Sequence, residues 1–438
     1  MAITATSDVI QGLRYTYGAD RLQYIASQEV PLWNVLSKTK KDMGGRGQFL
    51  IPILTKNPGA WTGITQGGAL PTALSPATTE ASYNLVEFVG IYELSWKLIQ
   101  DARTSKFAFQ QAIQMMDEGL RRRIFRLLNA DLLGTGRGEL GTLAAPSNAD
   151  PFTVRYLPRV EPGMPIDLIA NTDDATTRGI ANLPVTAVDA VGRTIKTGTA
   201  PAGTAANDYA TIAGTMTASL QLHMNGLLGV INNVNPQLAL NVANTGTQVR
   251  NIGNIDRSVA GNEFWKSPVL SNGGVNRALT EDLWLQAEDQ VREKGGAKLS
   301  NWFMNLAIGR RYHEIIRADT FFTMGRAEPL GGGLGREGKG PEGAGPDGDG
   351  RSPYEFSGVA VHFDPFFESN TVVGFDRSHF FLGVGENETP APISDIFDNV
   401  PFFRQTSNAS FQVAWYWQGQ LLTDSPPAGC QIKDIAEA

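Results

Sequence analysis

The sequence predicts an α+β protein in which one unusually long helix accompanies many short strands. Apolar residues from Phe109 to Leu127 recur three or four residues apart, which is the period of one helix face. Apolar and polar residues instead alternate in 86–96 and 411–417, which is the period of a half-buried strand. The chain has 438 residues, enough for roughly two to four domains.

The chain is poor in charge and rich in glycine. Charged residues make up 18% of it, against about 25% in an average soluble domain, and 48 residues are glycine. A disordered polyelectrolyte is excluded, because 9% of the residues are aromatic and the net charge is only −7. We expect no membrane partner, because no apolar run approaches the ~18 residues of a spanning helix. So few charges predict extensive burial of surface against partners.

Cys430 is the single cysteine, which excludes an internal disulfide and fits a reducing compartment. The first residues lack a basic flank followed by an apolar segment, so we expect no signal peptide. Residues 1–56 carry a small excess of basic side chains, which is too weak to predict a nucleic-acid binder.

An extended hairpin is predicted after an N-terminal arm over residues 1–44. Gln48 to Leu54 form one strand, and Pro52 within it cannot donate a ladder hydrogen bond, so this strand lies at an edge or a bulge. Val86 to Trp96 form the second strand, and a polar tip of about 30 residues separates the two. Because so thin a hairpin cannot bury its own core, we expect a neighbouring subunit to support it.

The apolar stripe from Phe109 predicts a helix that Thr104 or Ser105 can cap and that ends at Gly134. At ~1.5 Å per residue, its ~30 residues extend over about 45 Å, the length of a spine rather than of an ordinary domain helix.

Residues 141–250 predict a small β-rich insertion, because they carry few charges and alternate short β-prone pieces with turns. The predicted strands are Phe152 to Tyr156, Ile166 to Ala170, Leu183 to Val188 and Asp208 to Ile212.

A mixed α/β region follows. Thr280-Glu281-Asp282 predicts a helix start, and Lys294-Gly295-Gly296 its end. Residues 331–350 are half glycine, which predicts a flexible loop. The remaining predicted elements are a strand at Trp302 to Leu306, a helix at Arg310 to Arg317, and strands at Val359 to Phe363, Val372 to Phe375, Phe380 to Val384 and Phe411 to Trp417.

Phosphate-binding motifs are matched within the glycine-rich loop but lack their context. Gly333 to Gly338 spells GxGxxG, and Gly333 to Lys339 spells GxxxxGK. Both motifs need a following helix N-terminus, whereas Pro341 and further glycines follow here. We therefore predict no nucleotide site, and no cofactor.

Metal and nucleophile motifs are also incomplete. His313-Glu314 begins like a zinc-protease helix, but Arg317 stands where the second histidine belongs. Asp347 to Gly350 lacks the later acidic ligands of a calcium loop. Cys430 is expected in a tail segment without a base. The scattered histidines His223, His313, His362 and His379 are expected to be ordinary surface or half-buried residues. No catalytic, cofactor-binding or metal-binding residue is predicted, and the protein is predicted not to be an enzyme.

Arg121, Arg122, Arg123 and Arg126 form a basic face on the long helix. Such a face is more commonly solvated or engaged in salt bridges between subunits, and contact with enclosed nucleic acid is the alternative.

The order of elements resembles the major capsid proteins of tailed bacteriophages. Four stretches carry the resemblance: Gly59-Ala60-Trp61 through Pro71 followed by Tyr83 to Trp96, as in that family's extended loop; Leu132 to Gly136, as at the end of its spine helix; Asn207 to Gly214 with Met224 to Val230, as at the re-entry after its insertion; and Gly358 to Phe367, Val372 to Leu382 and Phe402 to Leu422 before Pro426-Pro427, as in its final strands.

This resemblance implies the Hong Kong 97-type capsid fold, with a long spine helix, an extended β-hairpin loop and a β-rich insertion. The implied parts are an N-terminal arm (1–44), an extended loop (45–96), a peripheral domain with the spine helix (97–145), an insertion domain (146–225), an axial domain that includes the glycine-rich loop (226–364), and a closing β segment (365–438).

The resemblance implies a structural, non-catalytic function: self-assembly into hexamers and pentamers of an icosahedral shell around double-stranded DNA, which is contacted non-specifically. The implied location is the virion capsid, assembled in the cytoplasm of a host bacterium. A portal and a decoration protein are further expected partners. Because the chain opens almost directly at the arm, we expect any scaffolding protein to be separate. Some relatives cross-link subunits through a lysine of the extended loop, and Lys56 lies near that position without an identifiable partner.

Two other functions remain open. An encapsulin-like compartment shell shares the implied fold, although such subunits are usually shorter and lack so large an insertion. A β-rich hydrolase with an unrecognised site is the alternative from a different class.

Overall fold

The computed structural model describes residues 31–40, 43–44, 48–56, 59, 68, 72, 75–95, 106–143, 146, 149–154, 159–171, 176–217, 220–235, 251–312, 314, 354–356, 358–385, 389–393, 403–404 and 410–437. These residues fall into two compact units. The described part of the first unit comes from Val86–Asn129 and Val384–Gly419. The second unit comes from Pro31–Leu85, Ala130–Gly383 and Gln420–Ala438. The predicted arm before residue 31, the predicted helix cap at 104–105 and the glycine-rich loop at 331–350 lie outside the described residues.

A long antiparallel strand pair forms the first unit's sheet. Strand β5 (Val86–Ser95) pairs with β23 (Ser410–Thr423), from Val86 opposite Gly419 to Ser95 opposite Ser410. Two short strands, β21 (Ala391–Pro392) and β22 (Phe403–Arg404), also pair with β23. The predicted alternation is confirmed, because Val413, Trp415 and Trp417 are buried whereas the residues between them are half-buried.

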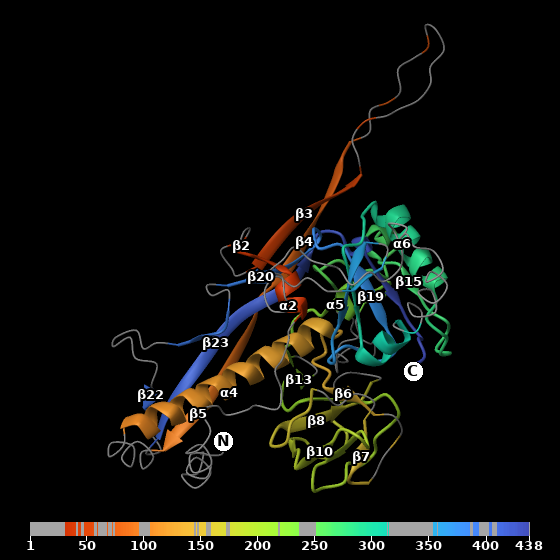
Figure 1. The fold of residues 1–438 in the computed structure, drawn as a ribbon. Coiled ribbons are helices and arrows are strands. Elements are labelled where there is room, and N and C mark those ends of the chain that lie inside the picture. Colours follow the sequence, from red (N-terminus) through yellow and green to blue (C-terminus); the bar gives the residue numbers. More distant parts are fainter. Residues whose placement is uncertain are drawn as a thin grey trace, which may run out of the picture. The chain divides into compact units, whose positions relative to one another are not determined.

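Helix α4 (Lys106–Leu133) is the predicted spine, and it ends directly before Gly134 as expected. Its first-unit part lies along β5 and β23 (Figure 1). Gly90 of β5 permits this close approach, since a Cβ atom there would lie 2.8 Å from Cδ1 of Ile124. Trp415 of β23 donates a 2.8 Å hydrogen bond from Nε1 to Oδ1 of Asp117 on the helix.

The hairpin is present, but its second strand differs from the prediction. Strand β3 (Gln48–Lys56) pairs antiparallel with β4 (Ala77–Asn84), and the short β2 (Met43–Gly44) pairs with the start of β3. The predicted partner, residues 86–96, pairs with β23 instead. Residues 77–84 look like a polar tip in the sequence, yet their threonines suit an exposed strand. Pro52 faces Glu80 of β4, beyond the short stretch that β2 covers, which agrees with its predicted edge position.

The base of this hairpin is anchored within the second unit. Ala81 and Tyr83 are buried, and the Tyr83 hydroxyl donates to the Thr423 carbonyl at 2.9 Å. The Ser82 amide donates to the Gly253 carbonyl at 3.0 Å. From Ala77 to Glu80, by contrast, the side chains are half-buried or exposed. The hairpin is therefore fixed at its base and solvated beyond it.

The β-rich insertion consists of small sheets, as predicted. One has the strand order β6-β12-β8-β9, a second β10-β11-β7, and a third pairs β13 with β14. Their bounds are Gly141–Thr142 (β6), Phe152–Thr153 (β7), Pro165–Ile169 (β8), Leu183–Pro184 (β9), Ala187–Asp189 (β10), Thr194–Lys196 (β11), Tyr209–Ile212 (β12), Met216–Thr217 (β13) and Leu220–Gln221 (β14). Buried Asp167 accepts from the amides of Asn182 and Gly214, so even the few charged residues here hold turns in place.

A six-stranded mixed sheet with the order β15-β24-β19-β16-β18-β17 lies in the second unit. Its strands are Val269–Leu270 (β15), Asn301–Met304 (β16), Tyr354–Phe356 (β17), Val359–Phe363 (β18), Val372–Phe375 (β19) and Gly429–Ile432 (β24). Helix α6 (Glu281–Gly295) contributes Trp284, whose ring contacts those of Trp302, Tyr312 and Phe356. Both predicted ends of this helix are confirmed: Thr280 Oγ1 accepts from the Leu283 amide, and Gly296 takes the left-handed conformation at φ 62°.

Three local predictions need correction. The predicted arm (1–44) includes a strand, β1 (Ser37–Thr39), which pairs in parallel with β20 (Phe380–Val384). The helix predicted from Arg310 begins at Leu306, and residues 313 and 315–317 lie outside the described part. The predicted tail around Cys430 is a buried strand between β15 and β19. The other short elements are α2 (Pro31–Val35), α5 (Leu227–Val230) and two 3-10 turns, Glu263–Trp265 and Pro426–Ala428.

Among the described helices, none combines the length and the apolar character needed to cross a membrane.

Candidate functional site

The residues of the rejected ligand motifs lie largely outside the described structure. His313 and residues 333–350 are among the undescribed residues, so the predictions about them stay predictions. Cys430 is described and fully buried. Burial raises the pKa of its thiol, which disfavours the reactive thiolate. Over the described ranges, no group of three or more His, Cys, Asp or Glu side chains is arranged to hold a metal ion.

Two of the predicted surface histidines are in fact buried. His362 is 5% exposed, stacks on Phe303 and contacts Asn301 Oδ1 through Nε2 at 3.1 Å. Burial lowers its pKa from 6.5 to about 4, so the ring is neutral near pH 7. His223 is 3% exposed, whereas His379 is half-buried and contacts Asp424 at 2.8 Å. Single-sequence patterns do not reveal this burial, because both buried rings are enclosed by elements distant in the chain.

A polar chain centred on buried His223, Asp131–His223–Thr215, is the nearest approach to a catalytic arrangement among the described residues, and no sequence motif predicted it. Nδ1 of His223 lies 3.1 Å from Asp131 Oδ2, and Nε2 lies 2.9 Å from Thr215 Oγ1. The order carboxylate, imidazole, hydroxyl is that of a nucleophilic triad. No local sequence motif predicts this arrangement, because Asp131 lies far from His223 in the sequence.

The proton positions in this chain do not favour nucleophilic catalysis. The Thr215 hydroxyl donates to the Ile212 carbonyl at 2.6 Å. Its single proton is thereby committed to an oxygen that can only accept. A nucleophilic hydroxyl must instead donate to the imidazole that activates it. We therefore interpret the chain as a structural joint.

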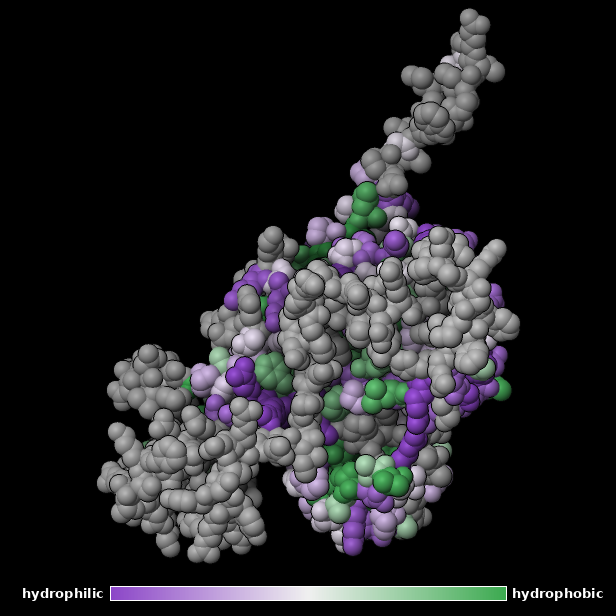
Figure 2. All heavy atoms as spheres, in the orientation of Figure 1, coloured by the Kyte–Doolittle hydropathy of each residue, from purple (hydrophilic) through white to green (hydrophobic). Residues whose placement is uncertain are grey.

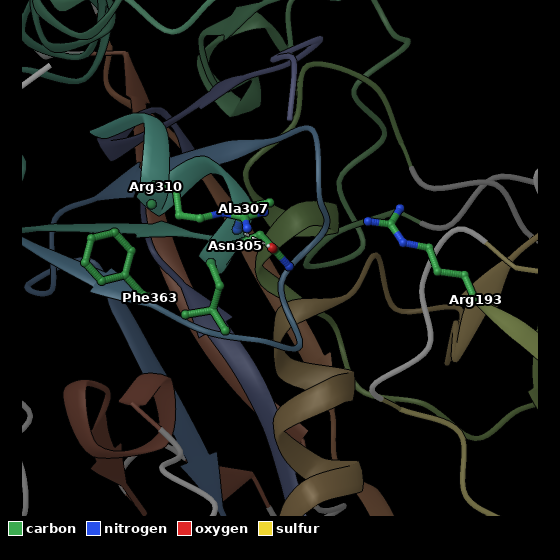
Figure 3. A pocket seen from close by; sticks show the side chains of 7 residues that line it. Arg193, Asn305, Ala307, Arg310 and Phe363 are labelled. Atoms are coloured by element: carbon green, nitrogen blue, oxygen red, sulfur yellow. Dashed lines mark hydrogen bonds between the residues drawn. The ribbon is translucent and has the colours of Figure 1, made fainter. Parts of the chain in front are cut away.

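A pocket of about 470 Å³ lies in the second unit. It is lined by Arg193, Asn305, Leu306, Ala307, Gly309, Arg310 and Phe363. Asn305, Ala307, Arg310 and Phe363 gather on one side, and Arg193 approaches from the other (Figure 3). Arg193 is paired with Glu437 at 3.0 Å. Burial opposes ionisation of Glu437, but hydrogen bonds from Ser369 and Arg193, with the charges of Arg193 and Arg310, lower its pKa. Among its described lining residues, no nucleophile is paired with a base.

The hairpin carries exposed apolar side chains. Leu50 is 38% exposed and Leu54 is 54% exposed, both on β3. Hydrophobic surface is visible along the hairpin in Figure 2. An isolated two-stranded ribbon is marginally stable in water, so exposed leucines on such an element indicate a surface that a partner covers.

The first unit has a similar apolar surface on the face of β5 and β23 that points away from α4. Val89 is 56% exposed, Ile91 is 39% exposed, and Tyr416 stands opposite Val89. Cross-strand hydrogen bonds between glutamate and glutamine flank this patch at both ends: Gln418 donates to Glu87 at 2.7 Å, and Gln412 donates to Glu93. We call Val89, Ile91 and Tyr416 the ribbon patch.

The predicted basic face of α4 is solvent-accessible. Arg121, Arg122 and Arg123 are exposed, and Arg126 is half-buried. Arg122 lies 4.0 Å from Glu118, and Arg121 lies over the Phe125 ring. The face is therefore partly engaged in contacts within the helix and remains accessible to an anion.

Comparison with solved structures decides the fold. A chain of the cyanophage A-1(L) capsid asymmetric unit is similar to this chain with a TM-score of 0.50 and 12% identity, covering 95% of this chain and 96% of that chain. This is a phage capsid fold. The capsid of the native GTA particle aligns with a TM-score of 0.42 and 10% identity over 95% and 94% of the two chains. Microbacterium phage Oxtober96 aligns with a TM-score of 0.43 and 12% identity over 99% of each.

The capsid fold confirms the α+β class and, at the level of fold, the resemblance seen in the sequence. No model of a protein family matches the chain, and no curated protein matches it. The likeness is therefore structural, and it extends over 95% of this chain.

Proposed function

We propose that this protein is the major capsid protein of a tailed bacteriophage with the Hong Kong 97-type fold. In this proposal it assembles into hexamers and pentamers of an icosahedral shell around double-stranded DNA. The observation that carries the proposal is the capsid fold shared with the cyanophage A-1(L) chain along nearly the whole length of both chains. The chain would then be located in the virion capsid and would assemble in the cytoplasm of its bacterial host.

The proposed domains follow the sequence analysis: arm 1–44, extended loop 45–96, peripheral domain 97–145, insertion domain 146–225, axial domain 226–364 and closing segment 365–438. Helix α4 would form the spine of the peripheral domain. The β15–β24 sheet, covered by α6, would belong to the axial domain together with part of the closing segment.

The two apolar surfaces support assembly as the activity. Leu50 and Leu54 on the hairpin and the ribbon patch each leave side chains in water that a second copy can cover. A contact made by a few apolar side chains is weak by itself. Closed symmetry repeats it in every subunit, so the free energies of the repeated contacts add up to stabilise the assembly. No reactive residue is required for such a function.

Packaged DNA is the proposed partner of the basic face of α4. Arg121, Arg122 and Arg123 can neutralise phosphates without reading sequence. This agrees with the expectation of non-specific contacts. Because the net charge of −7 does not attract DNA, binding of DNA would depend on local basic faces such as this one.

The proposal is tested by expressing the full chain and examining it by negative-stain electron microscopy. Regular shells tens of nanometres across support it, and protection of DNA inside them from nuclease supports the phage role. Shells that enclose an enzyme instead of DNA would identify an encapsulin-like compartment. A chain that stays monomeric across salt, pH and concentration, with or without added scaffolding protein, contradicts the proposal.

A further inference from the structure

The pocket of about 470 Å³ in the second unit has two cationic side chains and no acidic one among its described lining residues. Arg193 comes from the turn between β10 and β11, and Arg310 comes from the helix that begins at Leu306. The two side chains extend into the pocket from opposite sides (Figure 3). Because a guanidinium group stays charged at any physiological pH, the pocket presents positive charge to a ligand.

The backbone of Arg193 is unusual for a residue with a side chain. Its φ is 50°, in the left-handed region that residues other than glycine seldom adopt. The turn around it is fixed, because the Val154 amide donates to the Arg193 carbonyl at 2.9 Å and the Val191 amide donates to Asp189 Oδ1 at 3.0 Å. Glycine or asparagine is the ordinary residue at such a turn position. Strained backbone of this kind is concentrated at functional sites, so an arginine here indicates that its side chain is used.

Glu437 shows which chemistry these arginines bind. Nη2 of Arg193 donates to Oε2 of Glu437 at 3.0 Å, and Glu437 is not itself part of the pocket lining. Arg310 is close enough to attract the same carboxylate. Two cations beside one carboxylate leave a net positive charge at the pocket, so a second oxyanion can be held there by charged hydrogen bonds.

The rest of the lining is mostly apolar. Leu306 is 53% exposed, and Phe363 is half-buried. The Phe363 ring packs against Gly309, where a Cβ atom would lie 2.7 Å from Cδ1 of the ring. Asn305 is polar, but both ends of its side-chain amide are hydrogen-bonded to backbone groups of the chain. Cations that face apolar side chains suit a ligand with an anionic end and an apolar body.

We propose that this pocket binds a small phosphate monoester, with the phosphate held between Arg193 and Arg310 and the organic part against Leu306 and Phe363. A phosphate monoester has three terminal oxygens and nearly two negative charges, so it can bridge two guanidinium groups that approach from opposite sides. The volume suits a small molecule, since ligand pockets usually measure about 300–1,000 Å³. Without the ligand, Glu437 occupies Arg193 and competes for it. The proposal does not depend on the capsid function, because all these residues belong to the second unit of one chain.

Isothermal titration calorimetry of the full-length, unassembled protein in a phosphate-free buffer tests the proposal. The three probes are phenyl phosphate, inorganic phosphate and benzoate. We expect phenyl phosphate to bind about fivefold more tightly than inorganic phosphate, because its ring contacts Phe363. Benzoate should bind more weakly than phenyl phosphate, because it has a single charge and only two oxygens.

Three variants and a control locate the binding. R193N and R310Q should each weaken binding of phenyl phosphate about tenfold, the effect of one charged hydrogen bond. Asparagine is chosen at position 193 because it tolerates a positive φ, so the turn is retained. E437Q should strengthen binding by up to about fivefold, because Arg193 is then released from an exposed ion pair. R311Q is the control, since Arg311 is exposed, paired with Glu314 at 2.7 Å and outside the described lining.

Several outcomes would overturn the proposal. Wild-type protein that does not bind phenyl phosphate does so, as does an affinity that is unchanged in both R193N and R310Q while circular dichroism shows that they are folded. An equal loss of affinity in R311Q and R310Q would assign the binding to diffuse surface charge. Phenyl phosphate that binds no more tightly than inorganic phosphate or benzoate contradicts the ligand class. An E437Q affinity at or below that of the wild type contradicts the competition by Glu437.

Discussion

Trp415 and Asp117 form the polar contact that fixes α4 on the sheet of the first unit. The indole Nε1 of Trp415 donates to Oδ1 of Asp117 at 2.8 Å, and the Trp415 side chain is 8% exposed. The bond also sets the rotation of the helix about its axis, since Leu120 and Ile124 then lie over Gly90.

Removing this acceptor should destabilise the first unit. D117A leaves a buried indole N–H without its partner, which costs about 1–3 kcal/mol. D117N retains a carbonyl oxygen at the same place and should lose less stability than D117A. Chemical denaturation followed by tryptophan fluorescence measures both variants. Equal losses in D117A and D117N would show that the charge of Asp117, rather than its acceptor oxygen, holds the helix.

Gly226 should tolerate no side chain. A Cβ atom there would lie 2.0 Å from the carbonyl oxygen of Gly134 and 2.6 Å from that of Asp131, both backbone atoms at the end of α4. G226A must therefore displace the backbone, and we expect a loss of more than about 2 kcal/mol or no soluble protein. G90A is the matched control, because its clash is with the flexible tip of Ile124. Thermal unfolding of the two variants compares them, and a G226A midpoint equal to that of G90A would contradict the packing.

Acid should destabilise the second unit through His362. Its pKa is lowered from 6.5 to about 4 by burial, so in this window the unfolded chain binds a proton that the folded protein does not. Stability therefore falls as the pH drops from about 6.5 to about 4, by up to about 3 kcal/mol for this group. H362Q removes the titration and can still donate toward Asn301. Denaturation midpoints across this range should depend less steeply on pH in the variant, and parallel curves would refute the assignment.

Charge placed on the hairpin should block assembly without unfolding the subunit. L50D and L54D introduce carboxylates at positions that are 38% and 54% exposed in the subunit, so the substitutions should cost little folding stability. V275D is the control, at an apolar position that is 65% exposed outside the hairpin. Electron microscopy and sedimentation should show fewer shells for the hairpin variants at unchanged circular dichroism. Normal shell yield in L50D/L54D would exclude the hairpin as an assembly contact.

The basic face of α4 should contribute to salt-dependent DNA binding. Each phosphate that the protein no longer neutralises makes the slope of log affinity against log salt shallower by about 0.9. The triple variant R121Q/R122Q/R123Q should thus reduce the steepness of this slope by up to about 3 in binding of duplex DNA by unassembled protein. R311Q is the control, because Arg311 is exposed and paired with Glu314 at 2.7 Å. A slope unchanged in the triple variant would assign the face to contacts between subunits.

Helix ends and strand cores were predictable because their signals are local. The stop at Gly134, the cap at Thr280 and the αL glycine at 296 each depend on a few neighbouring residues. The partner of β3 was not predictable in this way. Residues 77–80 are half-buried or exposed, and only Ala81 and Tyr83 of this strand are buried. So short an alternation did not mark a strand, and the apolar strand at 86–95 was the better match by pattern alone.

The sequence by itself determined the α+β class, the spine helix, the β-rich insertion and the absence of a recognisable catalytic motif, since composition, period and spacing suffice for these. Only the tertiary structure decided that Cys430 is buried in a central strand and that Asp131, His223 and Thr215 meet. Burial and long-range hydrogen bonds depend on which elements pack together, and a single sequence does not encode that pairing in any local pattern.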